Sequence, residues 1–141
     1  MDIQECIDFA NENQVCYVAT VEGDQPRVRA IRLWFADDTG FYIQTQSVKA
    51  FAKQMENNNK IEICFFSPKV DRMMRASGKV EPVTDMAIRT RCLEEKPFLK
   101  KMGVEKPEDP LLAIFRLYTG EAYFWSMEYS MRESEIERVK F

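Results

Sequence analysis

The sequence contains no histidine, and this absence narrows the chemistry that its side chains can perform. It excludes serine–histidine–aspartate and cysteine–histidine nucleophile systems, and zinc sites that use histidine. The four cysteines, Cys6, Cys16, Cys64 and Cys92, form no CxxC pair, so we expect reduced, buried thiols and no metal site. A cofactor that carries its own reactivity is the natural source of any redox chemistry here.

The chain also lacks a basic excess and a long apolar run. Its formal net charge is −3 and its pI is near 5.2, so we expect no nucleic-acid partner. No stretch approaches the roughly 20 apolar residues of a membrane span. The first ten residues carry no positively charged leader region. We therefore expect a cytoplasmic protein with no membrane partner.

What is present suits a single domain over residues 1–141. The 141 residues are 45% hydrophobic and 30% charged, enough for one core and too few for two comfortable ones. Periodicity and turn signals predict helices over 2–13, 47–57 and 84–95, capped by Asp2, Ser47 and Thr84, and strands over 14–21, 27–36, 41–45, 60–67 and 72–82. Residues 96–110 read as a short helix plus loop, 111–127 as two strands around Thr119-Gly120, and 134–141 as frayed or helical. This order predicts a mainly β fold, a small antiparallel barrel with α decoration.

Arginines stand at one end of the predicted strand 27–36. Side chains alternate along a strand, so Arg27 and Arg29 share a face with apolar residues such as Ile31. A guanidinium group on such a face suits a bound phosphate or carboxylate. The alternative is that both arginines mark the exposed start of the strand, and these residues alone leave both interpretations open.

Lys49 falls in the first turn of the predicted helix 47–57. A cation there opposes the positive end of the helix dipole, at a cost of about 0.3–1 kcal/mol, whereas a bound anion would reverse that sign. The alternative is a solvated lysine on an exposed turn. If the predicted turn at 37–40 brings the two strands side by side, one anion could be bound by Arg27, Arg29, Thr45, Ser47 and Lys49.

Three segments carry a resemblance to a known family: PRVRAIRLWF (26–35), GFYIQTQSVKAFAKQMENNNKIEICFF (40–66) and RASGKVE (75–81). With them, residues 5–127 resemble the pyridoxamine 5′-phosphate oxidase-like, FMN-binding split β-barrel family. Within it, the chain is most similar to the branch that includes the nitroimidazole-resistance (Nim) proteins. The resemblance implies a six-stranded antiparallel split barrel and a homodimer with a flavin at the subunit interface.

The resemblance also implies a set of FMN contacts. It assigns the phosphate most strongly to Arg29 and Lys49, with Ser47 and Arg27 beside them. It assigns the surroundings of the flavin ring to Ala30, Ile31, Arg32, Tyr42, Gln44, Thr45 and Gln54, and to Trp125 of the partner chain with its neighbours Tyr123 and Phe124. For Phe124, plain strand core is the favoured alternative.

The predicted function is that of an FMN-dependent oxidoreductase acting on a small molecule, with NAD(P)H as a donor. The chain has neither the arginine-containing C-terminal motif of pyridoxine-phosphate oxidases nor the pocket histidine of some Nim proteins, so the substrate stays open. No catalytic residue is assigned, although Tyr42 or a pocket water could serve as acid or base. The alternatives are a non-catalytic flavin-binding, sequestering or redox-sensing protein, a binder of deazaflavin or haem in the same fold, and a plain interaction dimer.

Overall fold

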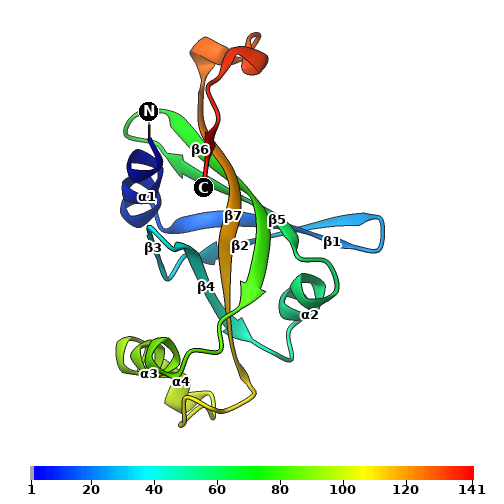
Figure 1. The fold of residues 1–141 in the computed structure, drawn as a ribbon, viewed down its shortest axis with the longest axis vertical. Helices are drawn as coiled ribbons and strands as arrows, with labels where there is room; N and C mark the ends of the chain where they lie inside the picture. Colours follow the sequence, from blue (N-terminus) through cyan, green and yellow to red (C-terminus); the bar gives the residue numbers. More distant parts are fainter. Residues whose placement is uncertain (1) are drawn as a thin grey trace.

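The computed structural model describes residues 2–141 and is built on one antiparallel sheet (Figure 1). Its strands are β1 (Val15–Glu22), β2 (Gln25–Arg32), β3 (Phe35–Asp37), β4 (Gly40–Gln46), β5 (Lys60–Ser67), β6 (Arg72–Pro82), β7 (Leu112–Ser126) and β8 (Val139–Lys140). The order is β2-β1-β5-β6-β7-β4-β3, with β8 paired to β7. The sheet curls into a barrel. The rings of Phe41 on β4 and Phe65 on β5 lie 6.1 Å apart, although two strands separate β4 from β5 in the sheet order. The predicted mainly β, antiparallel fold is confirmed, with eight strands instead of six.

The predicted strand 27–36 is two strands. β2 pairs with β1, whereas β3 pairs with β4. The chain changes partner at Leu33 and Trp34, whose backbone N–H groups donate to Gln14 O and Tyr42 O. Both side chains are buried there, so the connection between the two strands lies in the core. Its two residues are apolar and therefore do not indicate a loop in the sequence.

The predicted pair of strands in 111–127 is one strand, β7. It runs through Thr119 and Gly120 without a turn, because Gly120 lies opposite Gly78 of β6. A Cβ atom on Gly120 would lie 1.8 Å from Ser77 O, so the two backbones approach too closely for a side chain. The pairing of β6 with β7 also shifts register between Lys79 and Val80.

Four α-helices complete the fold: α1 (Ile3–Glu12), α2 (Ala50–Asn57), α3 (Met86–Glu95) and α4 (Phe98–Lys101). Asp2 caps α1 as predicted, by accepting a hydrogen bond from Glu5 N. The cap of α3 is Asp85 and not Thr84. α2 begins at Ala50 with Lys49 in the N-cap position, so the predicted cap Ser47 lies before the helix, where its N–H donates to Leu111 O. Within residues 2–141, no helix is long and apolar enough to cross a membrane.

Residues 134–141 are helical only at Ser134 and Glu135, which end a short 3₁₀ turn, and they are not frayed. Two short 3₁₀ turns, Met127–Tyr129 and Glu133–Glu135, form the protrusion at the top of Figure 1 and lead back to β8. Phe141 then exchanges two backbone hydrogen bonds with Gly120, and its ring packs 5.4 Å from that of Phe41. The end of the chain is therefore fixed against the barrel.

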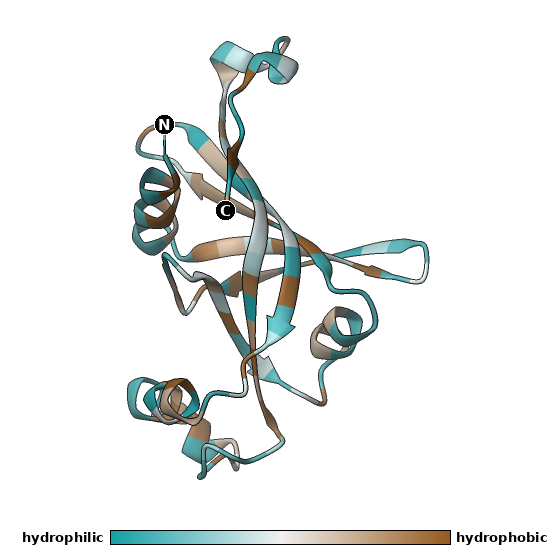
Figure 2. Cartoon of the chain, in the orientation of Figure 1, coloured by the Kyte–Doolittle hydropathy of each residue, from teal (hydrophilic) through white to brown (hydrophobic). Residues whose placement is uncertain are grey.

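The buried residues form two clusters. The larger fills the barrel and its contact with α1, and it includes Phe41, Ile63 and Leu117. The smaller lies under α3 and α4 and includes Trp34 and Leu112. Figure 2 shows brown, hydrophobic segments along the central strands and teal ones on the protrusion and on outward helix faces. β4 lies between the two clusters, because Phe41 and Ile43 on one of its faces belong to the larger and Tyr42 on the other belongs to the smaller.

Candidate functional site

A cleft of about 430 Å³ opens between β2, the end of β4, the start of α2 and the α3–α4 segment. Its walls contain four cations and no carboxylate. The lining residues are Arg29, Ala30, Ile31, Arg32, Gln44, Thr45, Gln46, Lys49, Phe51, Lys96, Phe98 and Met102. A slightly larger cavity of about 490 Å³, between α1 and the β5–β6 turn, mixes Glu12 with Lys69 and Arg72 and contains none of the predicted site residues. The positive charge of the cleft beside β2 and α2 makes that cleft the candidate site for an anionic ligand.

Arg29 reaches the cleft from β2 with its charge uncompensated. It donates from Nη1 to Val18 O (3.2 Å) and Thr20 Oγ1 (2.7 Å) and from Nη2 to Gln54 Oε1 (2.6 Å). All three acceptors are neutral, and a guanidinium has five N–H donors, so two remain free. Burial, and next the charge of Arg27, lowers the pKa of Arg29 below its usual value. Such a group is stabilised by a bound anion.

The start of α2 faces the same cleft. No side chain caps this helix, and its first turn contains no acidic residue. Its first N–H groups therefore lack a side-chain acceptor, and Lys49 in the N-cap position adds a positive charge beside them. Phe51, the second residue of the helix, has its ring centroid 4.5 Å from the Arg29 guanidinium carbon and forms an apolar wall.

The opposite half of the cleft carries amide and apolar groups. Alternation along β4 places Gln44 and Gln46 on the face that points toward α3–α4. Gln46 is 6% exposed, and its Oε1 atom is buried without a hydrogen-bond partner. Phe98 and Met102 are each 48% exposed at the mouth. An acceptor without a donor in such a wall suits a ligand that brings an N–H or O–H group.

Seven of the twelve predicted site residues line the cleft: Arg29, Ala30, Ile31, Arg32, Gln44, Thr45 and Lys49. The other five lie elsewhere. Arg27 is paired with Glu22, and Gln54 sits behind Arg29 with 6% exposure. Tyr42 is buried in the smaller core cluster, where its hydroxyl contacts Thr39 and Arg116. Ser47 and Trp125 do not line the cleft of their own chain.

Sequence reasoning missed five cleft residues: Gln46, Phe51, Lys96, Phe98 and Met102. Gln46 follows Gln44 by two positions on a strand, and that spacing was an available signal. Phe51 precedes Met55 at helical spacing, a pattern that indicates the apolar stripe of a helix and not a binding site. The other three belong to a segment some distance along the chain, and only the folded arrangement brings them to the cleft.

Trp125 lies on the outer face of the barrel, which we define by Val15, Tyr17, Val28, Phe66, Met73 and Trp125. Strand pairing connects them: Phe66 pairs with Met73 and Met73 with Trp125. Tyr17 pairs with Cys64, two residues before Phe66, and Val28 pairs with Ala19, two residues after Tyr17. Four of the six are exposed large hydrophobics: Val15 (51%), Tyr17 (50%), Val28 (70%) and Phe66 (43%). A contiguous apolar patch of this kind is typical of an interaction surface. Phe124, one position away, packs edge-on against Phe9 in the core.

Comparison with known proteins identifies the family. The model of the pyridoxamine 5′-phosphate oxidase family matches residues 3–126. A curated relative, the pyridoxine/pyridoxamine 5′-phosphate oxidase of Pseudomonas putida (strain W619), is 38% identical over 68 residues. That match covers 48% of this chain and 32% of the relative, so the chain matches about a third of the relative's length.

Solved structures share the whole fold. A NimC/NimA family protein from Clostridium acetobutylicum is 30% identical, with a TM-score of 0.79 over 98% of this chain and 92% of that one. An FMN-binding, pyridoxamine 5′-phosphate oxidase-related protein of Nostoc punctiforme PCC 73102 (13% identical, TM-score 0.71, 99% and 94% covered) shares the fold, as does the haem storage protein HutZ of Vibrio cholerae (14%, 0.64, 89% and 95%). The predicted split barrel and its NimC/NimA-like character are thereby confirmed. The chain belongs to the pyridoxamine 5′-phosphate oxidase-like family.

Proposed function

We propose that the cleft binds FMN and that the protein is a flavin-dependent oxidoreductase acting on a small molecule. The observation that carries this proposal is the uncompensated charge of Arg29, which has only neutral hydrogen-bond partners and faces a cleft without carboxylates. By contrast, the guanidinium groups of Arg27, Arg75 and Arg116 each lie against a glutamate. A phosphate monoester supplies the charge that Arg29 lacks.

The residues present fit the three kinds of group that FMN would bring. Its phosphate suits Arg29, Lys49 and the uncapped start of α2. Its apolar ring suits Ala30, Ile31 and the Phe51 wall. The ring also carries an N–H donor, and the orphaned Oε1 of Gln46 is an acceptor for such a donor.

The expected affinity is consistent with a retained cofactor. A hydrogen bond to a charged group contributes about 1.5–3 kcal/mol. Three of them at the phosphate, with some apolar contact at the ring, would reach about −8 kcal/mol, which is a micromolar dissociation constant.

FMN, when bound, supplies hydride or electron transfer, and the chain's own residues bind and orient it. We propose NAD(P)H as the electron donor. Tyr42 is not a candidate acid or base, because it is 2% exposed and lies outside the cleft. Anaerobic bleaching of the bound flavin by NAD(P)H separates an enzyme from a flavin-storing or sensing protein, since only the enzyme would be reduced rapidly.

We also propose that two copies of the chain associate through the outer face. The exposed apolar side chains of that face support this, and in such a dimer Trp125, which lies on the same face, would approach the cleft of the neighbouring subunit. Haem is a weaker candidate ligand. The HutZ similarity concerns the fold alone, and the sequence offers no histidine to ligate haem iron.

The site is tested by the double substitution Arg29→Ala with Lys49→Ala. Removing two charge-assisted contacts should weaken FMN binding by at least about 100-fold and leave the circular dichroism spectrum unchanged. FMN affinity is measured by quenching of flavin fluorescence. Lys53→Ala, on the same helix but outside the cleft, is the matched control and should bind as the wild type does. Equal affinity in the double variant and the wild type would overturn the phosphate assignment.

A further inference from the structure

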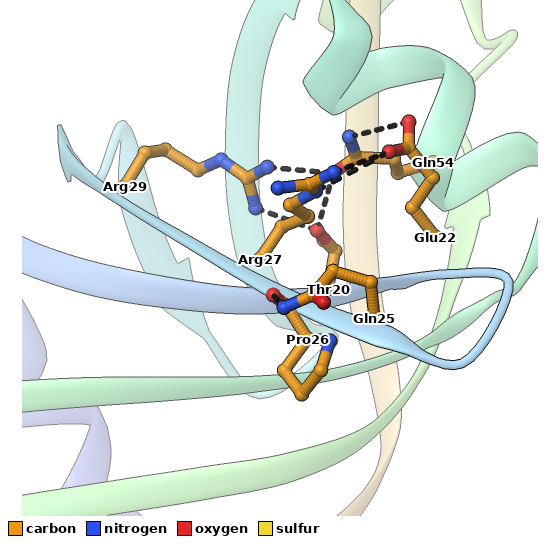
Figure 3. A network of polar contacts seen from close by, with 7 residues as sticks. All are labelled: Thr20, Glu22, Gln25, Pro26, Arg27, Arg29 and Gln54. Atoms are coloured by element: carbon orange, nitrogen blue, oxygen red, sulfur yellow. Dashed lines mark hydrogen bonds and ion pairs between the residues drawn. The ribbon is translucent and has the colours of Figure 1, made fainter.

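We propose that Gln54 is a positioning residue that holds Arg29 in place for the phosphate, and that Glu22, held in turn by Arg27, fixes the orientation of Gln54. This rests on the FMN site proposed above and reassigns two predicted contact residues, Arg27 and Gln54, to an indirect role. Figure 3 shows the four side chains, with Thr20, as one network of polar contacts from β1, β2 and α2.

Both ends of the Gln54 carboxamide are engaged away from the cleft. Its Oε1 accepts from Arg29 Nη2 (2.6 Å) and from Thr20 Oγ1 (2.6 Å), and its Nε2 donates to Glu22 Oε2 (3.3 Å). Thr20 Oγ1 also accepts from Arg29 Nη1 at 2.7 Å. Gln54 and Thr20 are 6% and 2% exposed and do not line the cleft. Their contact with a cleft ligand therefore runs through Arg29.

Only one orientation of the Gln54 amide pairs each donor of the network with an acceptor. A carboxylate only accepts hydrogen bonds and a guanidinium only donates them. Glu22 therefore binds the amide nitrogen of Gln54, which turns the amide oxygen toward Arg29. The flipped amide would set NH₂ against the guanidinium and oxygen against the carboxylate, and both contacts would be repulsive.

Glu22 is itself held by Arg27. Arg27 donates to Glu22 Oε1 from Nε (3.2 Å) and Nη2 (2.9 Å). Those hydrogen bonds, and then the one from Gln54, lower the pKa of Glu22, so its carboxyl is ionised at neutral pH. The pair is about half exposed, and such pairs contribute little to stability. Its effect is on orientation.

The arrangement keeps a carboxylate close to Arg29 without neutralising it. Gln54 lies between Glu22 and Arg29. Glu22 therefore fixes the orientation of the Gln54 amide, while the neutral amide and not the carboxylate contacts the Arg29 guanidinium. Arg29 is thus fixed by three neutral acceptors while its charge and two N–H donors stay available. A glutamate at position 54 would neutralise the charge of Arg29, because it would place a carboxylate directly against the guanidinium.

The test compares FMN with riboflavin, which has the same ring and no phosphate. Gln54→Leu should weaken FMN binding about tenfold and Gln54→Glu about 100-fold, while riboflavin binding changes less than about twofold. In an Arg29→Ala background, Gln54→Leu should change FMN binding by less than about twofold, because the positioned group is gone. Thr20→Val, which removes a different member of the network, should reproduce the phosphate-selective loss if a Gln54 variant folds poorly.

Two outcomes would overturn the inference while the FMN site stands. One is an equal loss of FMN and riboflavin binding in Gln54→Leu, and the other is a further tenfold loss when Gln54→Leu is added to Arg29→Ala. Either would indicate direct contact or a general effect on folding. A wild-type protein that binds no FMN would instead overturn the proposed function itself.

Discussion

At the scale of single residues, the neighbours of a charged side chain distinguish its possible roles better than its type does. The sequence contains 20 lysines and arginines, and its pattern predicts an anion site that includes Arg27, Arg29 and Lys49, whereas the family resemblance singles out Arg29 and Lys49. The pattern could not separate them from Arg27, because the separation depends on Glu22. Glu22 lies directly before the β1–β2 turn, and the fold of that hairpin brings it against Arg27.

One residue-scale prediction concerns the C-terminal end of α3, which directly precedes the cleft residue Lys96. Trp34 Nε1 donates to Glu95 at 3.0 Å, and Arg91 also binds this carboxylate. Arg91 first, and then Trp34, lowers the pKa of Glu95. The stabilisation is therefore present above the usual glutamate range and is lost as the pH falls through the lowered value in the folded protein.

We expect Trp34 fluorescence, recorded in a Trp125→Phe background, to change below the usual glutamate range while circular dichroism still reports a folded barrel. Glu95→Gln cannot titrate and should remove this step. A step at or above the usual range, or one that persists in Glu95→Gln, would contradict the role given to Glu95.

At the scale of elements, the sequence identified most helices and strands but not where they divide or join. Residues 27–36 divide because β2 and β3 pair with different strands, and residues 111–127 stay continuous because Gly120 meets Gly78. Both outcomes depend on partners far away in the chain. A local signal such as Thr119-Gly120 can indicate a turn or a close approach of two strands, and only the partner strand decides.

The close approach of β6 and β7 at Gly78 and Gly120 gives an element-scale prediction. Gly120→Ala should lower the free energy of unfolding by about 1–3 kcal/mol, because its Cβ would overlap Ser77 O. Urea unfolding followed by circular dichroism measures the loss. Gly23→Asn is the control, since no atom lies within 4 Å of a Cβ there and asparagine tolerates its positive φ of 64°. Equal stability of Gly120→Ala and the wild type would contradict this close approach, because it would mean that the two backbones leave room for a Cβ atom at position 120.

At the scale of the whole molecule, the cleft is assembled from parts that are local and parts that are distant in sequence. Three of its four cations, Arg29, Arg32 and Lys49, come from one short stretch of the chain and could be identified from the sequence. Lys96, Phe98 and Met102 reach it only because α3–α4 packs beside the end of β4. The outer face is also a property of the folded sheet, since its residues come from five strands.

The outer face yields the prediction for assembly. Tyr17→Asp places one charge in each half of a two-fold interface, so it should weaken self-association by about 100-fold or more. Light scattering after size-exclusion chromatography measures the mass in solution. Val70→Asp, at an exposed apolar residue in the β5–β6 turn and outside the outer face, is the control. A wild-type monomer, or a dimer unaffected by Tyr17→Asp, would contradict the proposed interface.

The central claim is that the cleft of this protein holds FMN. Its most direct test is the visible absorbance spectrum of the freshly purified protein, repeated after FMN addition and desalting. We predict a retained flavin spectrum, with close to one flavin per chain, released on denaturation and identified by mass as FMN. A protein that stays colourless after loading, or one that retains haem or a deazaflavin instead, would contradict the claim.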